Sequence, residues 1–246
     1  MEEKENYIFG IRAIQEAIIA GKEVDKIIAR KGLNGELFGQ LQKLCNEKRI
    51  RIQYTEAEVL DRITTGNHQG VVALMSAIEY LTLEELIEKL RASDKTPLLL
   101  MLDGVTDVRN FGAIVRTAHC AGVQGIIVPT KGSAPINGES VKTSAGALHH
   151  MPICKSGNLY LAVKMLKGNG IQVVCVTEHG DDDYYSVDLK KPTLLIMGSE
   201  DKGISNQLLK LADARACIPM EGSIESLNVS VAAGILLFET KRQRTK

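Results

Sequence analysis

Two hydrophobic periods alternate along the first 77 residues. Apolar residues that recur every three or four positions predict helices, and short apolar runs between them predict strands. The predicted order is strand 7–10, helix 11–21, strand 24–30, helix 36–48, strand 50–55, helix 56–64 and strand 69–77. Three rounds of alternation favour a small α/β domain over residues 1–77.

The alternation resumes after a charged stretch with one amphipathic helix, residues 78–96, which we expect to be a linker. The next run, "PLLLMLDGV", is apolar throughout, which is typical of a parallel sheet covered on both faces. We therefore expect a second α/β domain over 97–246. Its predicted elements are strand 97–105, helix 110–122, strand 125–129, helices 138–150 and 159–170, strands 171–177 and 193–199, helix 205–212, strand 215–220 and a helix from 229.

Composition limits the classes of function. The chain of 246 residues is 44% hydrophobic, which is enough to bury a sizeable core. Its 30 basic and 30 acidic residues cancel, so it has no overall basic surface for nucleic acid. Binding to RNA would have to rest on shape and local patches, of which 47–51 and 241–246 are the obvious basic ones.

Cysteines and termini indicate the compartment. The five cysteines are scattered and none form a Cys-x-x-Cys pair, which argues against a zinc site or a redox dithiol. Most have apolar neighbours, as expected of buried thiols in a reducing compartment. The start "MEEKEN" lacks the apolar core of a signal peptide, and no apolar run is long enough to span a membrane. These features predict a cytoplasmic protein with no membrane partner and no metal.

The stretch "GSEDKGIS", Gly198–Ser205, has the glycine spacing of a phosphate-binding loop. That interpretation fails because Ile204 stands where the lysine should be, and Glu200 and Asp201 would repel phosphate. A strand-to-helix turn capped by Ser205 and a ligand site at the end of a strand remain equally open.

Another polar signal lies in "DVRNFGAIVRTAHCAG". Asn110 is by default a helix cap, whereas Arg116 lies on a helix that is apolar nearly all round. A guanidinium in that position is expected to face a cleft or a partner chain. His119 and the pair His149 and His150 lack metal-ligand neighbours at fitting spacing, and the acidic run 181–183 is expected to be a solvated loop.

The last candidate stretch is "IPMEGSIESLNVSVAAGILLFE", residues 218–239. A buried helix from Val229 follows a polar turn, in which Ser226 or Asn228 can serve as the cap. Taken alone, this stretch supports only the cap.

Together the three stretches resemble motifs one, two and three of the SpoU-type (TrmH-like) RNA ribose 2′-O-methyltransferases of the SPOUT class. The N-terminal half, which opens with "IFGIRAIQEAI" and closes with "TTGNHQGVVA", is similar to the substrate-binding domain of that family, which is related to a ribosomal-protein fold. Within the family, the chain most resembles the subgroup that methylates a guanosine ribose of 23S ribosomal RNA.

The resemblance implies an α/β methyltransferase domain with a parallel sheet and a C-terminal trefoil knot. It implies S-adenosylmethionine as the cofactor, bound by Gly198, Ile218, Met220 and Leu227. It also implies a homodimer through the knotted domain, in which each site can borrow residues from the partner chain.

The resemblance assigns the central catalytic role to Arg116. Because an arginine is not readily deprotonated, we expect it to grip a substrate phosphate and polarise the ribose 2′-hydroxyl. The phosphate or Glu200 would then receive the proton. The residues expected to hold this arrangement by hydrogen bonds are Asn110, Glu200, Ser226 and Asn228.

The sequence therefore predicts methylation of a ribose 2′-hydroxyl in RNA, with a guanosine of 23S ribosomal RNA as the expected target. Two alternatives stay open: a transfer-RNA 2′-O-methyltransferase, and a non-catalytic RNA-binding or ribosome-assembly protein on the same scaffold.

Overall fold

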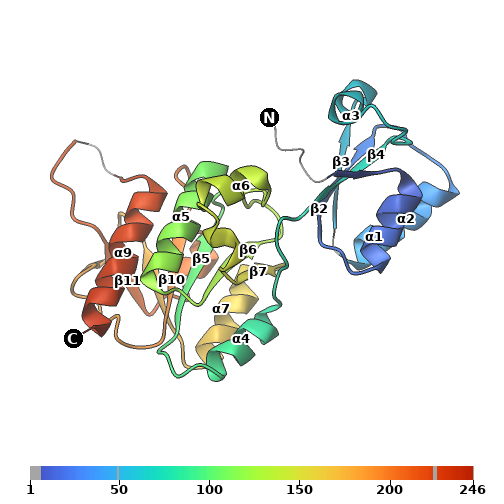
Figure 1. The fold of residues 1–246 in the computed structure, drawn as a ribbon. Helices are drawn as coiled ribbons and strands as arrows, with labels where there is room; N and C mark the ends of the chain where they lie inside the picture. The colour runs from blue at the N-terminus through green and yellow to red at the C-terminus, as the bar shows by residue number, and fades with distance from the viewer. Residues whose placement is uncertain (1–6, 49, 224–225, 246) are drawn as a thin grey trace. The chain divides into compact units, whose positions relative to one another are not determined.

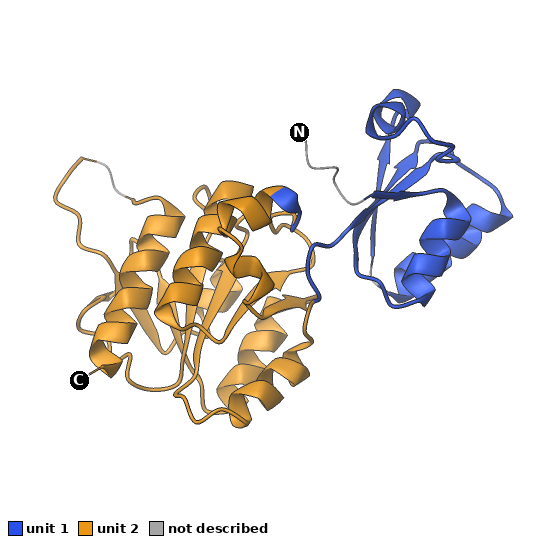
Figure 2. Cartoon of the chain, viewed as in Figure 1, with its two compact units in different colours: residues 1–79, 136–138 blue, residues 80–135, 139–246 orange. Residues whose placement is uncertain are grey.

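The computed structural model of the protein describes residues 7–48, 50–223 and 226–245 (Figure 1). The chain divides into two units, coloured separately in Figure 2. The first unit contains residues 1–79 and 136–138, and the second contains 80–135 and 139–246.

The first unit is a four-stranded mixed sheet in the order β1-β4-β2-β3. Strands β2 and β3 are parallel, and the other neighbours are antiparallel. The strands and helices alternate as the sequence predicted. In chain order they are β1 (Tyr7–Phe9), α1 (Ile11–Ile19), β2 (Val24–Arg30), α2 (Glu36–Glu47), β3 (Arg51–Thr55), α3 (Ala57–Ile63) and β4 (Val71–Met75).

Helices cover both faces of this sheet. On one face α1 and α2 bury apolar side chains such as Ile14 and Leu41 against the strands. On the other face Leu60 of α3 packs against Ile28 and Val72. Both faces of the sheet are thus closed by amphipathic helices, which gives the unit its own core.

The expected linker contributes a helix to the core of the second unit. Helix α4 (Leu83–Arg91) begins with a capping box, in which Thr82 Oγ1 accepts from the Glu85 N–H and the Glu85 carboxylate accepts from the Thr82 N–H. Its buried residues Leu86 and Leu90 belong to the core cluster of the second unit. The amphipathic pattern predicted the helix, but its packing depends on a sheet surface formed by later strands.

The second unit is built on a seven-stranded sheet in the order β7-β6-β5-β10-β8-β11-β9. All neighbours are parallel, which confirms the predicted fold class. None of the described helices has the length and apolar character that a membrane crossing requires. The elements after α4 are β5 (Leu98–Asp103), α5 (Val108–Ala121), β6 (Gly125–Pro129), α6 (Gly138–Thr143), the 3₁₀ turn η1 (Ala147–His149), β7 (Ile153–Ser156), α7 (Leu159–Gly168), β8 (Gln172–Val176), β9 (Asp182–Asp183), β10 (Thr193–Gly198), α8 (Asn206–Leu209), β11 (Ala214–Cys217) and α9 (Val229–Arg244).

Alternate side chains of the strands pack on opposite faces of this sheet. Leu99, Met101 and Ile196 share one core cluster with α4, α7 and α8. Helices α5 and α9 pack against each other on the opposite face, where α9 also contacts β10. Parallel strands end at one common edge, so this arrangement gathers the loops that follow β5, β8, β10 and β11.

Three local predictions differ from the structure. The predicted helix 138–150 is broken because Ala145 and Gly146 have positive φ angles of 50° and 80°, so only α6 and the turn η1 form. Strand β7 was not predicted, since it is a four-residue edge strand with two buried residues. The acidic run 181–183, expected to be a loop, contributes the short strand β9, which pairs with β11.

The cysteines are mostly buried thiols, as their apolar neighbours indicated. Burial raises the pKa of Cys45 to about 11 and the pKa of Cys154 and Cys175 to about 12. Cys217 is half-buried and Cys120 is exposed on α5. At neutral pH the three buried thiols are therefore protonated and shielded from reagents.

The C-terminal end of α9 is clasped by the Arg244 guanidinium. This side chain donates hydrogen bonds at 2.6–3.0 Å to the carbonyl oxygens of Thr96, Pro97, Leu189 and Lys191, and a longer one to the Thr193 hydroxyl. The clasp joins α9 to the starts of β5 and β10 and to the segment before β10. The trefoil knot that the resemblance implies stays a prediction.

Replacing Arg244 with alanine should destabilise the second unit by about 3 kcal/mol, because four backbone carbonyls lose one charged donor together. Urea unfolding followed by circular dichroism measures the change. Lys241→Ala, which alters an exposed cation in the same helical turn, is the matched control and should cost less than about 0.5 kcal/mol. Equal midpoints for the two variants would contradict the clasp.

Candidate active site

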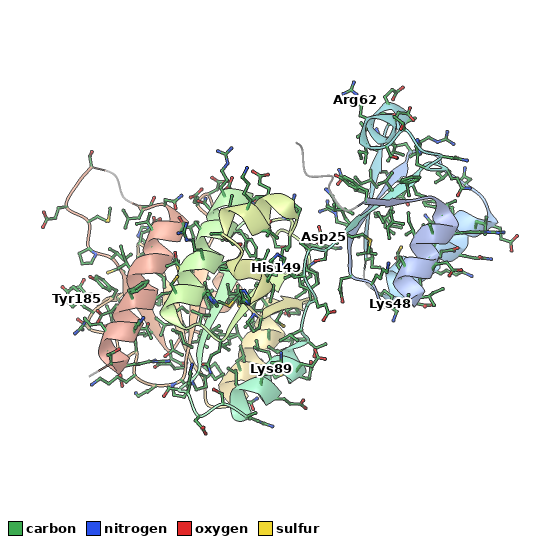
Figure 3. The ribbon with its side chains drawn as sticks, in the orientation of Figure 1. Asp25, Lys48, Arg62, Lys89, His149 and Tyr185 are labelled. Carbon is green, nitrogen blue, oxygen red and sulfur yellow. The ribbon has the colours of Figure 1, made fainter. Side chains whose placement is uncertain are left out.

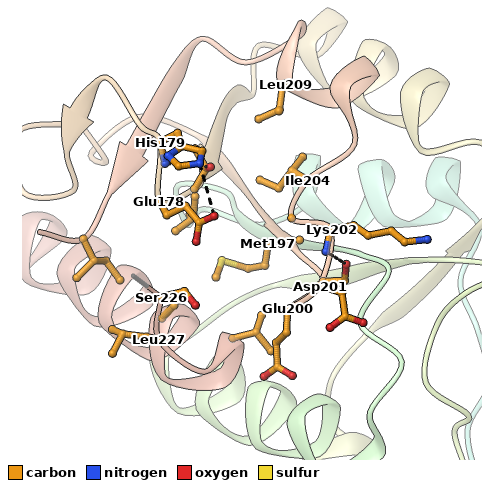
Figure 4. Close-up of a pocket in the computed structure, with 18 of the residues that line it drawn as sticks. Glu178, His179, Met197, Glu200, Asp201, Lys202, Ile204, Leu209, Ser226 and Leu227 are labelled. Atoms are coloured by element: carbon orange, nitrogen blue, oxygen red, sulfur yellow. Dashed lines mark hydrogen bonds and ion pairs between the residues drawn. The ribbon is translucent and has the colours of Figure 1, made fainter. Parts of the chain in front are cut away.

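A cavity of about 380 Å³ opens at the carboxyl edge of the second unit's sheet (Figure 4). Its walls come from the ends of three neighbouring strands and the segments that follow them. These are residues 176–179 at the end of β8, 197–204 at the end of β10, and Ile218 with Met220 after β11. The start of α9 and the turn before it close the remaining side. Ligands of parallel α/β sheets bind at this edge.

The structure gathers most of the candidate residues here. All four residues expected to bind the cofactor, Gly198, Ile218, Met220 and Leu227, line the cavity. The catalytic candidates Glu200 and Ser226 line it as well. The other three candidates, Asn110, Arg116 and Asn228, do not line it and are described below.

The segment Gly198–Ser205 is both a turn and a cavity wall. A Cβ on Gly198 would lie 2.1 Å from the carbonyl carbon of Gly203, so only glycine allows the loop to fold back on β10. Gly203 has a φ angle of 63°, and its N–H donates to the Ser199 carbonyl at 2.9 Å. The two glycines thus serve a tight turn that presents Glu200 to the cavity.

Asp103, at the end of β5, anchors the far side of this turn. Its carboxylate accepts a hydrogen bond at 2.8 Å from the backbone N–H of Ser205, 102 residues later. Ser205 is the N-cap residue of α8, as predicted, but its side chain makes no capping hydrogen bond. The loop is therefore held by a neighbouring strand.

A hydrogen-bonded cluster joins all three sequence motifs. The Glu200 carboxylate oxygen Oε1 accepts from the Asn110 side-chain amide at 3.0 Å and from the Asn228 amide at 2.9 Å. The same Asn228 amide donates to Asn110 Oδ1 at 2.9 Å. Residues that are 28 to 118 positions apart therefore meet at one carboxylate beside the cavity.

Asn228 is also the cap of α9. Its Oδ1 accepts from the backbone N–H of Ser230 at 2.9 Å and from the Ser230 hydroxyl. This capping contact orients the amide so that both of its hydrogens face Glu200 and Asn110. Residues 224 and 225 lie outside the described residues, as do Arg49 and Lys246 of the two basic segments.

Asn110 is not a helix cap, contrary to the default expectation. Asp107 caps α5, and its side chain accepts from the Asn110 N–H at 2.8 Å. Asn110 lies in the first turn of α5, where its own side chain is available for Glu200. An aspartate three residues earlier was the signal for this capping.

Arg116 is exposed on α5. Among the residues that the structure describes, its guanidinium has no hydrogen-bond or ion-pair partner. It follows Asn110 by six residues, about 9 Å along the helix axis. Arg116 therefore does not line the cavity described above, and the expectation that it faces a cleft or a partner chain stays a prediction.

The histidines do not form a metal site in the described part of the chain. His119 and His150 are exposed, with ring centroids 5.8 Å apart. No three His, Cys, Asp or Glu side chains among the described residues are placed to hold a metal ion.

Residues 177–179, which follow β8, also line the cavity and were not among the candidates. The run "VVCVTEHG" carries no motif for them. Their place follows from sheet order, since β8 lies between β10 and β11. A search for polar residues after each predicted parallel strand would have found Thr177 and Glu178.

Family models match both units. Residues 97–238 match the model described as the SpoU rRNA methylase family. Residues 7–81 match the model for RNA 2′-O ribose methyltransferase substrate binding.

Individual relatives agree along the whole chain. A Bacillus subtilis protein named as a TrmH family tRNA/rRNA methyltransferase is 34% identical over 245 residues, which cover 99% of this chain and 98% of that protein. The solved SpoU methyltransferase AviRb of Streptomyces viridochromogenes, in complex with AdoMet, is 27% identical with a TM-score of 0.63 and covers 97% of this chain and 90% of that one.

The AdoMet-bound rRNA methyltransferase of Sinorhizobium meliloti is similar at 28% identity and a TM-score of 0.61, over 96% of this chain and 86% of that chain. These matches, together with the cavity and the cluster beside it, show that the chain belongs to the SpoU family and is an S-adenosylmethionine-dependent RNA ribose methyltransferase.

Proposed function

We propose that the protein transfers a methyl group from S-adenosylmethionine to the ribose 2′-hydroxyl of a guanosine in 23S ribosomal RNA, in the cytoplasm. The observation that carries the site assignment is the convergence of Asn110 and Asn228 on Glu200 beside the cavity. The family model's description as an rRNA methylase supports ribosomal RNA as the substrate.

The cavity fits the cofactor. Its volume of about 380 Å³ lies within the range of about 300–1,000 Å³ that is usual for small-molecule sites. Apolar side chains, among them Met197, Ile204 and Leu209, suit an adenine ring, and the carboxylate of Glu200 suits a cationic ligand (Figure 4). Gly198, Ile218, Met220 and Leu227 are the residues that we assign to holding it.

S-adenosylmethionine supplies a methyl group that its positive sulfur has already activated for transfer. The protein then has to place the ribose hydroxyl and remove its proton. Glu200 is the candidate acceptor, because its Oε1 is held by two amides and the second oxygen, Oε2, is free to face the hydroxyl. Asn110 and Asn228 position that carboxylate, and Ser226 lines the cavity beside them.

Arg116 is assigned to the substrate phosphate and to polarising the hydroxyl, since its guanidinium remains protonated and forms two parallel hydrogen bonds with phosphate oxygens. Its exposure on α5, away from the cavity of its own chain, favours action on the site of a second chain. The proposed enzyme is therefore a homodimer with composite sites.

A second copy of this chain fits the exposed face of α9. Val231, Ile235 and Phe238 form an apolar stripe on this helix, in which Val231 is 51% and Phe238 47% exposed. Helix α9 packs on α5, which carries the exposed Cys120 one turn after Arg116. An exposed apolar stripe on the helix that packs against α5, the helix of Arg116, is what a two-fold interface would cover.

Two alternatives remain distinct from this proposal. A transfer-RNA target agrees with the tRNA/rRNA naming of the Bacillus subtilis relative. A non-catalytic RNA-binding role agrees less well, because a binding protein does not need an amide-braced carboxylate at a cofactor cavity.

Deleting the gene should remove one ribose methyl mark from 23S ribosomal RNA, and returning the gene should restore it. Mapping of 2′-O-methylation across ribosomal and transfer RNA measures this. Loss of a transfer-RNA methyl mark would show that transfer RNA is the substrate instead. An unchanged methylation map would favour a non-catalytic RNA-binding protein.

Replacing Glu200 with glutamine should lower the turnover number about a hundredfold while the KM for S-adenosylmethionine changes less than about threefold, because the amide keeps the shape but loses the proton acceptor. Glu88→Gln makes the same chemical change on the exposed surface of α4 and should retain full activity. A Glu200→Gln enzyme as fast as Glu88→Gln would exclude the acceptor role.

Mixing two inactive variants tests the composite site. Arg116→Ala and Glu200→Ala chains, co-expressed in equal amounts, should recover about a quarter of wild-type activity, because about half of the dimers are mixed and one of their two sites is intact. Each variant expressed alone is the control. No recovery in dimers shown to be mixed would place Arg116 in the site of its own chain.

A further inference from the structure

Glu178 is a carboxylate in the cavity that the methyl-transfer chemistry does not use. It follows β8 by two residues and lines the cavity together with Glu200, which comes from the loop after β10 (Figure 4). The two carboxylates therefore enter one cavity from two neighbouring strands.

The backbone around Glu178 is fixed to the neighbouring strand β11. The Thr177 N–H donates to the Ala216 carbonyl at 3.0 Å, and the His179 N–H donates to the Thr177 hydroxyl at 3.4 Å. A Cβ on Gly180 would lie 2.6 Å from the Arg215 carbonyl oxygen, so this turn is pressed directly onto β11. The backbone on both sides of Glu178 is thus packed against β11.

The Glu178 carboxylate has acceptor capacity to spare. Its partner among the described residues is the Nε2 atom of His179, at 3.7 Å, and that imidazole is 87% exposed. Such an ion pair is too long for a strong hydrogen bond and is weakened by solvent. Glu200 differs, because two amides already occupy its Oε1.

A third acidic residue, Asp201, also lines the cavity, and like Glu178 and Glu200 it is exposed. In Figure 4 its carboxylate lies on the far side of that loop from Glu178 and Ser226. Glu178 is therefore the carboxylate that has no hydrogen bond among the described residues and that, unlike Asp201, lies on the same side of the loop as Ser226.

We propose that Glu178 binds the adenosyl ribose of the cofactor by accepting hydrogen bonds from its 2′- and 3′-hydroxyl groups. This inference rests on the proposed assignment of the cavity to S-adenosylmethionine. The two donors of a vicinal diol match the two oxygens of one carboxylate, and an acidic residue near the end of a parallel strand serves this purpose in dinucleotide-binding folds. The ammonium group of the cofactor could also donate to Glu178. Ligands with and without this group therefore distinguish the ribose from the ammonium group as the partner of Glu178.

The test measures binding by isothermal titration calorimetry with S-adenosylhomocysteine and with 5′-methylthioadenosine, which keeps the ribose but has no amino-acid group. Glu178→Ala should weaken both ligands by about tenfold to a hundredfold, as expected for loss of hydrogen bonds to a charged group. Glu178→Gln, which keeps one acceptor oxygen, should weaken them by about three- to tenfold.

A ligand that lacks both hydroxyls completes the cycle. The 2′,3′-dideoxy form of 5′-methylthioadenosine should bind wild type about as weakly as 5′-methylthioadenosine binds Glu178→Ala, and the variant should show little further loss. Glu88→Gln is the matched control, with wild-type affinities expected, and thermal unfolding verifies that each variant is folded.

Weakening of S-adenosylhomocysteine alone would assign Glu178 to the ammonium group and overturn the proposal. Unchanged affinities for both ligands in Glu178→Ala would leave the residue as a cavity wall and overturn it too. Failure of wild type to bind S-adenosylhomocysteine would instead overturn the cofactor site itself.

Discussion

The structure of the candidate site depends on hydrogen bonds to one oxygen of Glu200. Asn110 comes from the first turn of α5 and Asn228 from the start of α9, and both donate to that atom. One carboxylate oxygen can accept both hydrogen bonds, and the negative charge of the carboxylate strengthens each of them. The contact fixes the entry of α9 into the fold at one end, and the Arg244 clasp fixes its exit at the other. Helix α9, whose first turn closes one side of the cavity, is held between these two contacts.

Much of the fold could be predicted because most elements are long and periodic. The apolar run of β5 and the repeating faces of α1 and α4 give signals that do not depend on distant residues. Strand β7 gives almost none, since only two of its four residues are buried and its pairing with β6 decides the assignment. The break after α6 occurs at Ala145, and it could not be predicted because alanine rarely adopts a positive φ angle.

Only the site residues that lie within the three sequence motifs could be predicted. Each of the three motifs alone has an ordinary explanation as a turn or a cap, and their agreement in order is what identified the residues. Asp107 and Asn110 are both good caps, and the aspartate three residues earlier was a signal that the default assignment of the cap to Asn110 overlooked. Glu178 escaped notice because its place at the cavity follows from the order of β10, β8 and β11. That order is a property of long-range pairing.

The double use of Asn228 makes this position vulnerable to chemical ageing. Its oxygen caps α9, and its two amide hydrogens are donated to Glu200 and Asn110. Serine and aspartate, which cap helices about equally well, have no such pair of donors and cannot replace it. Asparagine is also among the residues that degrade with heat. Hydrolysis of this amide would keep the cap but set a second negative charge against Glu200. A deamidated protein would thus stay folded but lose the hydrogen bonds that hold the Glu200 carboxylate. The residue that follows, Val229, is β-branched and slows deamidation by crowding the backbone.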